Sequence, residues 1–289
     1  MSVTGLSEEQ IEAYRTDGYL VLDGVFDRER LDRIDQTVRQ ITDDAISSGD
    51  YSKILELEPA NDDGKPITRR IFNPFDQHEE FQALATDTFL LDCVESLIGH
   101  NFSLQHSKLN MKPAKVGSAV EWHQDLAYFP HTNDDLITLL IYLDDATKEN
   151  GCSQVLPRHH THYFDHSRPD GRFAGMITED LDSGNFGRAV SLPAPAGSVI
   201  FMHPITPHSS LPNNSDKQRR TLIYEYRASD SFPIYYGEQT AIAESQLRQL
   251  RGKPAKFARF GGPPPLIPNI NTYQSLYQLQ LDAKAEVQS

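Results

Sequence analysis

From about residue 101 onward, the chain is built of short β-rich segments that are separated by Pro, Gly and Asn. The turn sequences "KENG", "PAPAG" and "PNNSD" mark the ends of several of these segments. Seven short strands with little helix between them favour two packed sheets of the jelly-roll type, with any helices outside. The candidate strands cover residues 102–112, 120–128, 136–145, 151–157, 187–194, 197–204 and 219–228.

The preceding part of the chain predicts helices that would pack outside this β core. The segment "LSEEQIEAYRTDGY" has Ser7 and Gln10 at the spacing of a capping box, which predicts a helix that ends near Gly18. Asp27 can cap a second helix, in which apolar residues recur at a 3.6-residue spacing. The remaining predictions are a strand over 19–26, helices over 28–46 and 79–100, and a polar loop over 47–66.

The chain has no internal repeat and no clear domain boundary, so we expect one domain over residues 1–289. Its parts would be a helical N-terminal buttress over about 6–100, a jelly-roll core over about 101–230, and a C-terminal helix and loop extension over 231–289. The fold class is thus mainly β with flanking α-helices.

Charge and composition restrict the partners that such a chain can have. The net charge of −14 disfavours nucleic acid and anionic membrane, because binding to either depends on Lys and Arg. The N-terminus lacks the basic and apolar regions of a secretory signal, and two cysteines fit a reducing compartment. We expect a cytoplasmic protein that acts on a small molecule, with no membrane, nucleic-acid or obligate protein partner.

The segment "EWHQDLAYFP" contains His123 and Asp125, which are candidate metal ligands. Residues two apart in a strand point to the same face, about 6.6 Å apart along the chain. Both side chains could therefore reach one ion, while Gln124 would face the other way. A His-x-Asp pair alone is weak evidence for a metal site, because polar residues on a loop give the same pattern.

A third ligand could come from "SVIFMHPITPHSSLPNNSDKQRR", which offers His203 and His208. Two His and one carboxylate on one face form the ligand set of non-heme Fe(II) oxygenases, which leave coordination positions open for O2 and a cosubstrate. If the cosubstrate is 2-oxoglutarate, its far carboxylate needs a cation, for which Arg is well suited. A hairpin after His208 would place Arg219 or Arg220 nearby, so His208 is favoured over His203.

These residues carry a resemblance to the phytanoyl-CoA dioxygenase family of Fe(II)/2-oxoglutarate oxygenases. The matching segments are "HQDLAYFP" (123–130), "NGCSQVLPRHH" (150–160), "GSVIFMHPITPHSSLPNNSDKQRR" (197–220) and the N-terminal "EEQIEAYRTDGYLVLDGVF". The resemblance implies a double-stranded β-helix (jelly-roll, cupin-like) core that binds Fe(II), 2-oxoglutarate and O2.

The resemblance also implies roles for individual residues. His123, Asp125 and His208 would bind iron, and Arg219 and Ser210 would bind the 2-oxoglutarate carboxylate. Lys108 stands where relatives have a Met of the cosubstrate pocket, and Arg70 stands where they have a cosubstrate-binding Lys. The pocket wall therefore differs, and the phytanoyl-CoA substrate does not follow from the resemblance.

The expected reaction is hydroxylation of an unactivated C–H of a small organic substrate, with release of succinate and CO2. The substrate could be an acyl-CoA, a carboxylic acid or a natural-product intermediate. Two alternatives remain: a cupin-like metalloenzyme that does not use 2-oxoglutarate, and a non-catalytic binding protein with a vestigial site.

Overall fold

The computed structural model describes residues 5–58, 66–181, 186–234, 244–245, 247–268 and 274–287. Its helices are α1 (Glu8–Asp17), α2 (Arg28–Ser48), α3 (Pro74–Gln77), α4 (Glu79–Ala85), α5 (Thr88–Ile98) and α7 (Leu276–Val287), with a 3-10 turn η1 (Asp125–Ala127). The strands are β1 (Tyr19–Leu22), β2 (Leu55–Leu57), β3 (Thr68–Phe72), β4 (Phe102–Lys112), β5 (Val120–His123), β6 (Leu136–Tyr142), β7 (Ser153–Val155), β8 (Val190–Ser191), β9 (Val199–Met202), β10 (His208–Ser210), β11 (Arg219–Ala228) and β12 (Arg248–Arg251).

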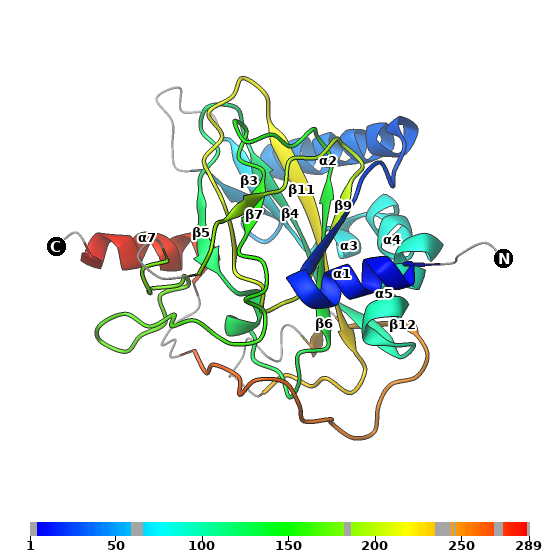
Figure 1. Cartoon of the computed structure of the whole chain (residues 1–289). Coiled ribbons are helices and arrows are strands. Elements are labelled where there is room, and N and C mark those ends of the chain that lie inside the picture. The colour runs from blue at the N-terminus through cyan, green and yellow to red at the C-terminus, as the bar shows by residue number, and fades with distance from the viewer. Residues whose placement is uncertain are drawn as a thin grey trace.

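Two antiparallel sheets form the centre of the molecule (Figure 1). The larger sheet has the order β1-β9-β6-β11-β4-β3-β2, with β12 also paired to β4. The smaller sheet has the order β5-β10-β7-β8. Because both sheets take strands from distant parts of the sequence, the described chain has the double-sheet jelly-roll architecture that the strand pattern predicted.

Helices cover the outer face of the larger sheet, on the right-hand side in Figure 1. The core between them contains apolar residues of α2, α4 and α5 packed against those of β4 and β11. Tyr224 and Tyr226 of β11 are fully buried there, and their hydroxyls donate to the carbonyls of Phe81 and Ala85 at 2.7 and 2.8 Å. Even residues of β11 therefore face the helices, and odd residues face the space between the sheets.

The sequence signals for the first two helices are confirmed in detail. Ser7 accepts a hydrogen bond from the Gln10 backbone in a complete capping box, and Gly18 ends α1 in the left-handed conformation. Asp27 caps α2 by accepting from the backbone of Arg30.

The single helix predicted over 79–100 is wrong, because the chain forms α4 and α5 there. The break lies at Thr86 and Asp87, where the Asp87 side chain accepts from the backbone N–H groups of Phe89 and Leu90. An Asp that can satisfy the free donors of a new helix start favours a break over continuation.

Several other strand predictions need correction, and the strands predicted over 19–26, 136–145, 151–157 and 187–194 are shorter than expected. The segment predicted as a strand over 120–128 is extended only to His123 and then turns into η1. Strand β2 lies inside the segment predicted as a polar loop, and part of that loop, 59–65, lies outside the described residues. The short strands β3, β10 and β12 were not predicted. The assignment of all 289 residues to one domain stays a prediction.

The C-terminal helix α7 packs beside β5, on the side of the molecule opposite the other helices (Figure 1). Its Gln280 is 3% exposed, accepts from the backbone N–H of Glu121 at 3.1 Å and donates to the carbonyl of Gly175 at 2.8 Å. Arg168 adds an ion pair to Glu286 at 2.8 Å. The helix is thus attached to the strand that carries His123.

No helix among the described residues is long and apolar enough to cross a membrane.

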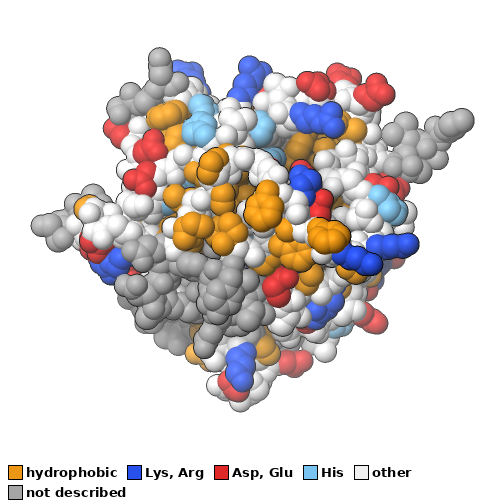
Figure 2. Space-filling model, turned by 90° about the horizontal axis from the view of Figure 1, so that it is seen from below, with side chains coloured by type: hydrophobic (Ala, Val, Ile, Leu, Met, Phe, Trp, Pro, Cys, Tyr) orange, Lys and Arg blue, Asp and Glu red, His pale blue; other side chains and the backbone are white. Residues whose placement is uncertain are grey.

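The segment 247–268 runs along the lower edge of the molecule in Figure 1, and Figure 2 shows that hydrophobic side chains gather on the lower face. The exposed apolar residues of this segment are Phe257, Phe260 and Ile267.

Replacing Gln280 with Ala should destabilise the protein because the partly buried N–H of Glu121 loses its acceptor and the Gly175 carbonyl keeps only the Tyr128 hydroxyl as donor. We expect the free energy of unfolding to fall by about 1–3 kcal/mol, measured by urea denaturation. Gln278→Ala is the matched control, since Gln278 lies on the exposed side of the same helix. Equal effects of the two substitutions would contradict the attachment of α7 through Gln280.

Candidate functional site

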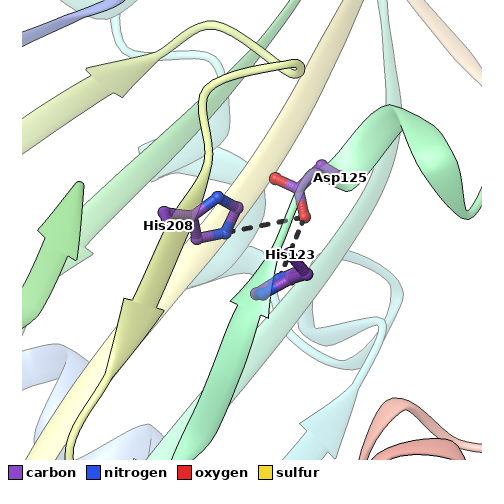
Figure 3. A group of neighbouring side chains, drawn as sticks. All are labelled: His123, Asp125 and His208. Atoms are coloured by element: carbon purple, nitrogen blue, oxygen red, sulfur yellow. Dashed lines mark ion pairs between the residues drawn. The ribbon is translucent and has the colours of Figure 1, made fainter. Parts of the chain in front are cut away.

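The pairing of β5 with β10 places His123 and His208 directly opposite each other. The strands are antiparallel, so the two side chains project from one face of the smaller sheet toward the larger sheet. Their ring centroids lie 4.1 Å apart. Figure 3 shows both imidazoles beside the carboxylate of Asp125, which comes from the start of η1.

The three side chains present one ligand atom each to a common point. The Nε2 atoms of His123 and His208 lie 3.7 and 3.9 Å from the same oxygen of Asp125, Oδ1. All three ligand atoms lie within 4.8 Å of one another. Within the described ranges this is the one group of His, Cys, Asp and Glu that could hold a metal ion.

Backbone carbonyls fix which imidazole nitrogen faces this point. The Nδ1 atom of His123 lies 2.8 Å from the carbonyl of Glu121, and that of His208 lies 3.0 Å from the carbonyl of Thr206. A carbonyl only accepts, so each Nδ1 carries the proton and donates it. Each Nε2 therefore keeps its lone pair, as in metal sites whose histidines are oriented by a second hydrogen bond.

The protonation states of these groups are also those of metal ligands. Burial lowers the pKa of His123 well below its usual value, so the imidazole is neutral. Burial on its own would raise the pKa of Asp125, but the charge of Lys108 and the hydrogen bond from Thr138 hold it below its usual value. The second oxygen of Asp125 accepts from the Thr138 hydroxyl at 2.9 Å, which leaves Oδ1 free for an ion.

The expected geometry of the His-x-Asp pair needs a correction, because the two residues do not share one strand. His123 ends β5, and Asp125 begins η1. Gln124 faces the other way as predicted, since its side-chain NH2 donates to the carbonyls of His162 and Ile205 at 2.9 and 2.7 Å. This anchoring turns the chain so that the carboxylate of Asp125 comes back toward His123.

A cavity with an empty volume of about 540 Å³ lies between the sheets and opens onto the triad. Every site residue that the sequence predicted lines it. They are His123, Asp125, His208, Ser210, Arg219, Lys108 and Arg70.

Arg219 projects into this cavity from β11 and is 3% exposed. Its guanidinium donates to the Thr221 hydroxyl and to the carbonyl of Gly151, and its Nε has no hydrogen-bond partner. Within the described part of the chain, no Asp or Glu lies at ion-pair distance from it. Burial lowers its pKa from the usual value, as expected for a cation removed from water without a partner anion.

Arg220 has the opposite environment. It points to the other face of β11, where its guanidinium forms ion pairs with Asp35 and, at 2.7 Å, with Asp144. Alternation along the strand therefore separates a paired arginine on the helix side from an unpaired one inside the cavity.

The predicted hairpin between His208 and the two arginines is wrong. Strand β10 pairs with β5 and β7, and β11 pairs with β4 and β6, so the two strands lie in different sheets. His208 and Arg219 instead meet across the cavity that the sheets enclose.

Gly151 lets the segment "NGCSQV" pass close to the backbone of Leu211. Its φ of +74° lies in the left-handed region, and a Cβ there would lie 2.2 Å from the carbonyl oxygen of Leu211. Glycine is therefore required at this position, where the carbonyl accepts from Arg219.

The other predicted residues make contacts of their own on the cavity wall. Lys108 lies 3.2 Å from Glu225, and the Nε of Arg70 donates to the side chain of Asn110 at 2.9 Å. Ser210 is buried on β10. His203 lies 3.7 Å from Asp134 and is not part of the triad.

Sequence reasoning missed several residues of the cavity. Asn110 lies two positions after Lys108 on β4, so strand alternation could have placed it on the same wall. Thr138 and Leu276 had no such signal, because their positions depend on contacts between distant segments. Lys112, which pairs with Arg219 across β4 and β11, is 3% exposed, and its ammonium donates to the carbonyls of Ser118 and Leu211 at 2.5 and 2.7 Å.

Two imidazole nitrogens and one carboxylate oxygen suit Fe(II) and leave room for further ligands. The donor types, the fixed Nε2 lone pairs and the free Oδ1 all fit such an ion. The cavity beside them can hold small molecules that bind the same ion.

Comparison with known proteins identifies the family. The model of the family "Phytanoyl-CoA dioxygenase (PhyH)" matches residues 14–221. A relative from Stutzerimonas stutzeri, named as a probable alpha-ketoglutarate-dependent hypophosphite dioxygenase, is 32% identical over 82% of this chain and 85% of its own length. The L-proline trans-4-hydroxylase of Streptomyces griseoviridis is 26% identical over 81% of this chain and 91% of its own.

Solved structures support the fold. The structure of EctD from S. alaskensis with 2-oxoglutarate and 5-hydroxyectoine superimposes with a TM-score of 0.67 at 21% identity, covering 91% of this chain and 89% of that chain. Since the family model spans most of the chain and the first relative aligns over most of both proteins, this chain belongs to the phytanoyl-CoA dioxygenase family and is a 2-oxoglutarate-dependent dioxygenase, as its motifs predicted.

Proposed function

We propose that His123, Asp125 and His208 bind the Fe(II) ion of this dioxygenase. The support is the convergence of two Nε2 lone pairs and one carboxylate oxygen inside a buried cavity. A bound Fe(II) ion supplies the open positions at which 2-oxoglutarate and O2 react to succinate and CO2 while the substrate is hydroxylated. The chain itself orients the three ligands, through the carbonyls of Glu121 and Thr206 and the hydroxyl of Thr138.

Arg219 is the residue that binds the distal carboxylate of 2-oxoglutarate in this proposal. The observation that carries it is a buried guanidinium with no acidic partner among the described residues and with an Nε that makes no hydrogen bond. A buried charge without a partner is costly, so the site favours a carboxylate from outside the chain. Ser210 lines the same cavity and would add a hydroxyl donor to that carboxylate.

This cation also separates the dioxygenase from the two alternatives. A cupin-like enzyme without 2-oxoglutarate has no use for an unpaired arginine in the cavity, and a vestigial site would not retain three oriented ligands and that arginine together. The cavity contains ligands for an ion, in the triad, and a cation for a dicarboxylate, in Arg219.

The substrate in this proposal is a small molecule. Both relatives described above carry the names of small substrates, hypophosphite and L-proline, which supports a compact substrate over an acyl-CoA. The side chains that surround the ion also exclude bulk water, since His123 and Asp125 are 4% and 3% exposed.

The direct test of the function is turnover under defined conditions. Protein reconstituted with Fe(II) without oxygen and then given O2 and 2-oxoglutarate should form succinate, and a substrate should accelerate it. Succinate is measured by chromatography against a metal-free control. Equal succinate in both samples would exclude the proposed chemistry.

Replacing Asp125 with Ala should abolish tight Fe(II) binding, because the one negative ligand is lost. We expect Fe(II) affinity to fall by at least about 100-fold, measured by competition with a coloured chelator. Asp134→Ala is a control, since Asp134 lies outside the triad. Unchanged Fe(II) affinity in Asp125→Ala would show that the ion binds elsewhere.

Replacing Arg219 with Met should weaken 2-oxoglutarate binding while Fe(II) still binds. Loss of a buried charge pair costs about 2–5 kcal/mol, so the Kd for 2-oxoglutarate should rise at least about 30-fold. The Kd is measured without oxygen from the visible absorption that appears when the keto acid binds Fe(II). Arg220→Met is the matched control, since Arg220 faces the helices, and an equal loss in both variants would contradict the assignment.

A further inference from the structure

Lys108 lies beside the proposed metal ligands and away from Arg219. On β11, Arg219 pairs with Lys112 of β4, and Ile223 pairs with Lys108. Arg219 and Ile223 are four residues apart, which corresponds to about 13 Å along the strand. Lys108 therefore contacts a different part of the cavity from the one that would hold the distal carboxylate of 2-oxoglutarate.

The same end of the cavity holds the metal ligands. Glu225, the partner of Lys108, pairs across β11 and β6 with Thr138, whose hydroxyl donates to Asp125. Lys108 and Asp125 line the same cavity. A molecule that contacts Lys108 from the cavity would thus lie next to the ion.

Glu225 forms an ion pair with the ammonium of Lys108 but does not line the cavity. One oxygen of Glu225 lies 3.2 Å from the Nζ of Lys108 and 3.2 Å from the Nε2 of His106. The Glu225 side chain is 2% exposed and that of Lys108 is 21% exposed, and only Lys108 lines the cavity. An ammonium has three donors, and Glu225 is its one hydrogen-bond acceptor among the described residues, so donors remain for a ligand.

A second cation lies on the same wall. Strand β3 pairs with β4 so that Arg70 lies opposite Asn110, two positions from Lys108 on the same face. Of the described residues that line the cavity, Arg70, Lys108 and Arg219 are basic, and Asp125 is the single acid. Arg70 also lies 3.5 Å from Glu56, which does not line the cavity, so the wall itself presents more cations than carboxylates although the whole chain has a net charge of −14.

We propose that the substrate is a small anion whose charged group binds Lys108, with Arg70 beside it, and whose reacting atom then lies next to the ion. This inference rests on the proposed function, because it takes the ion at His123, Asp125 and His208 as given. It departs from the expectation that Lys108 and Arg70 bind the cosubstrate, since Lys108 lies at the metal end of the cavity and Arg70 lies on the same wall. Glu225 is a positioning residue here, because it holds Lys108 without lining the cavity.

The test measures anion binding without turnover. Protein with Fe(II) and 2-oxoglutarate, kept free of oxygen, is titrated with methylphosphonate, with propionate and with neutral propionamide. The visible absorption of the bound keto acid reports a molecule that binds beside the ion. We expect at least one anion to perturb this absorption in a saturable way, while propionamide has no effect at the same concentrations.

The variant Lys108→Met keeps the length of the side chain and removes its charge. It should weaken binding of that anion at least about tenfold, as expected for a lost charge-assisted hydrogen bond, while the Kd for 2-oxoglutarate changes less than about twofold. The unchanged Kd for 2-oxoglutarate also shows that the variant is folded. Lys148→Met is the matched control, since Lys148 is exposed, and it should behave as the unsubstituted protein does.

Four results would overturn the inference. Equal binding of propionamide and the anions, or no effect of either anion, would exclude an anion site beside the ion. A raised Kd for 2-oxoglutarate in Lys108→Met would assign Lys108 to the cosubstrate. Absence of the visible absorption in the unsubstituted protein would instead overturn the proposed function, and the inference with it.

Discussion

The antiparallel pairing of β5 with β10 is the constraint on which the rest of the site depends. It places His123 opposite His208 and gives both imidazoles the same orientation toward the larger sheet. Each ring is then fixed by a carbonyl two residues before it, so the backbone that forms the sheet also sets the position of both lone pairs. Asp125 needs only one turn beyond β5 to complete the group. A fold that separated these two short strands would have no metal centre, whatever residues it retained.

The two faces of strand β11 have different environments, the apolar core on one side and the space between the sheets on the other. Its even residues pack into the apolar core under the helices, and two of them donate hydroxyl hydrogen bonds to that layer. Its odd residues carry Arg219 and Glu225 into the space between the sheets. The strong burial of one face fixes the register of the strand, because a slip by one residue would exchange the two faces. The stability of the core thereby determines where the charges of the cavity lie.

Sequence reasoning succeeded where the signal was local. Strands 102–112 and 219–228 were predicted with their observed bounds, because each is long and bounded by turn residues. Strand β10 is only three residues, His-Ser-Ser, and has no apolar pattern that could reveal it. The break between α4 and α5 did have a signal, the helix-starting Asp87, but the continuous apolar pattern around it favoured one long helix.

For the site, the residue types and their spacing predicted the ligands, but not how the chain brings them together. The predicted hairpin failed because β10 and β11 join different sheets, a choice made by partners far away in the sequence. Alternation does place Arg219 and Arg220 on opposite faces, but which face meets the cavity depends on the helices that cover the other one. Thr138 and Leu276 could not be predicted from the sequence for the same reason, since packing between distant segments brings them to the cavity.

The position of α7 has a consequence for how the protein matures. All three residues of the triad precede α7 in the sequence, whereas Leu276 of that helix forms part of the cavity wall. A ribosome makes the ligands first and this wall last. The part of the cavity wall that Leu276 supplies can therefore form only after all three residues of the triad have been made.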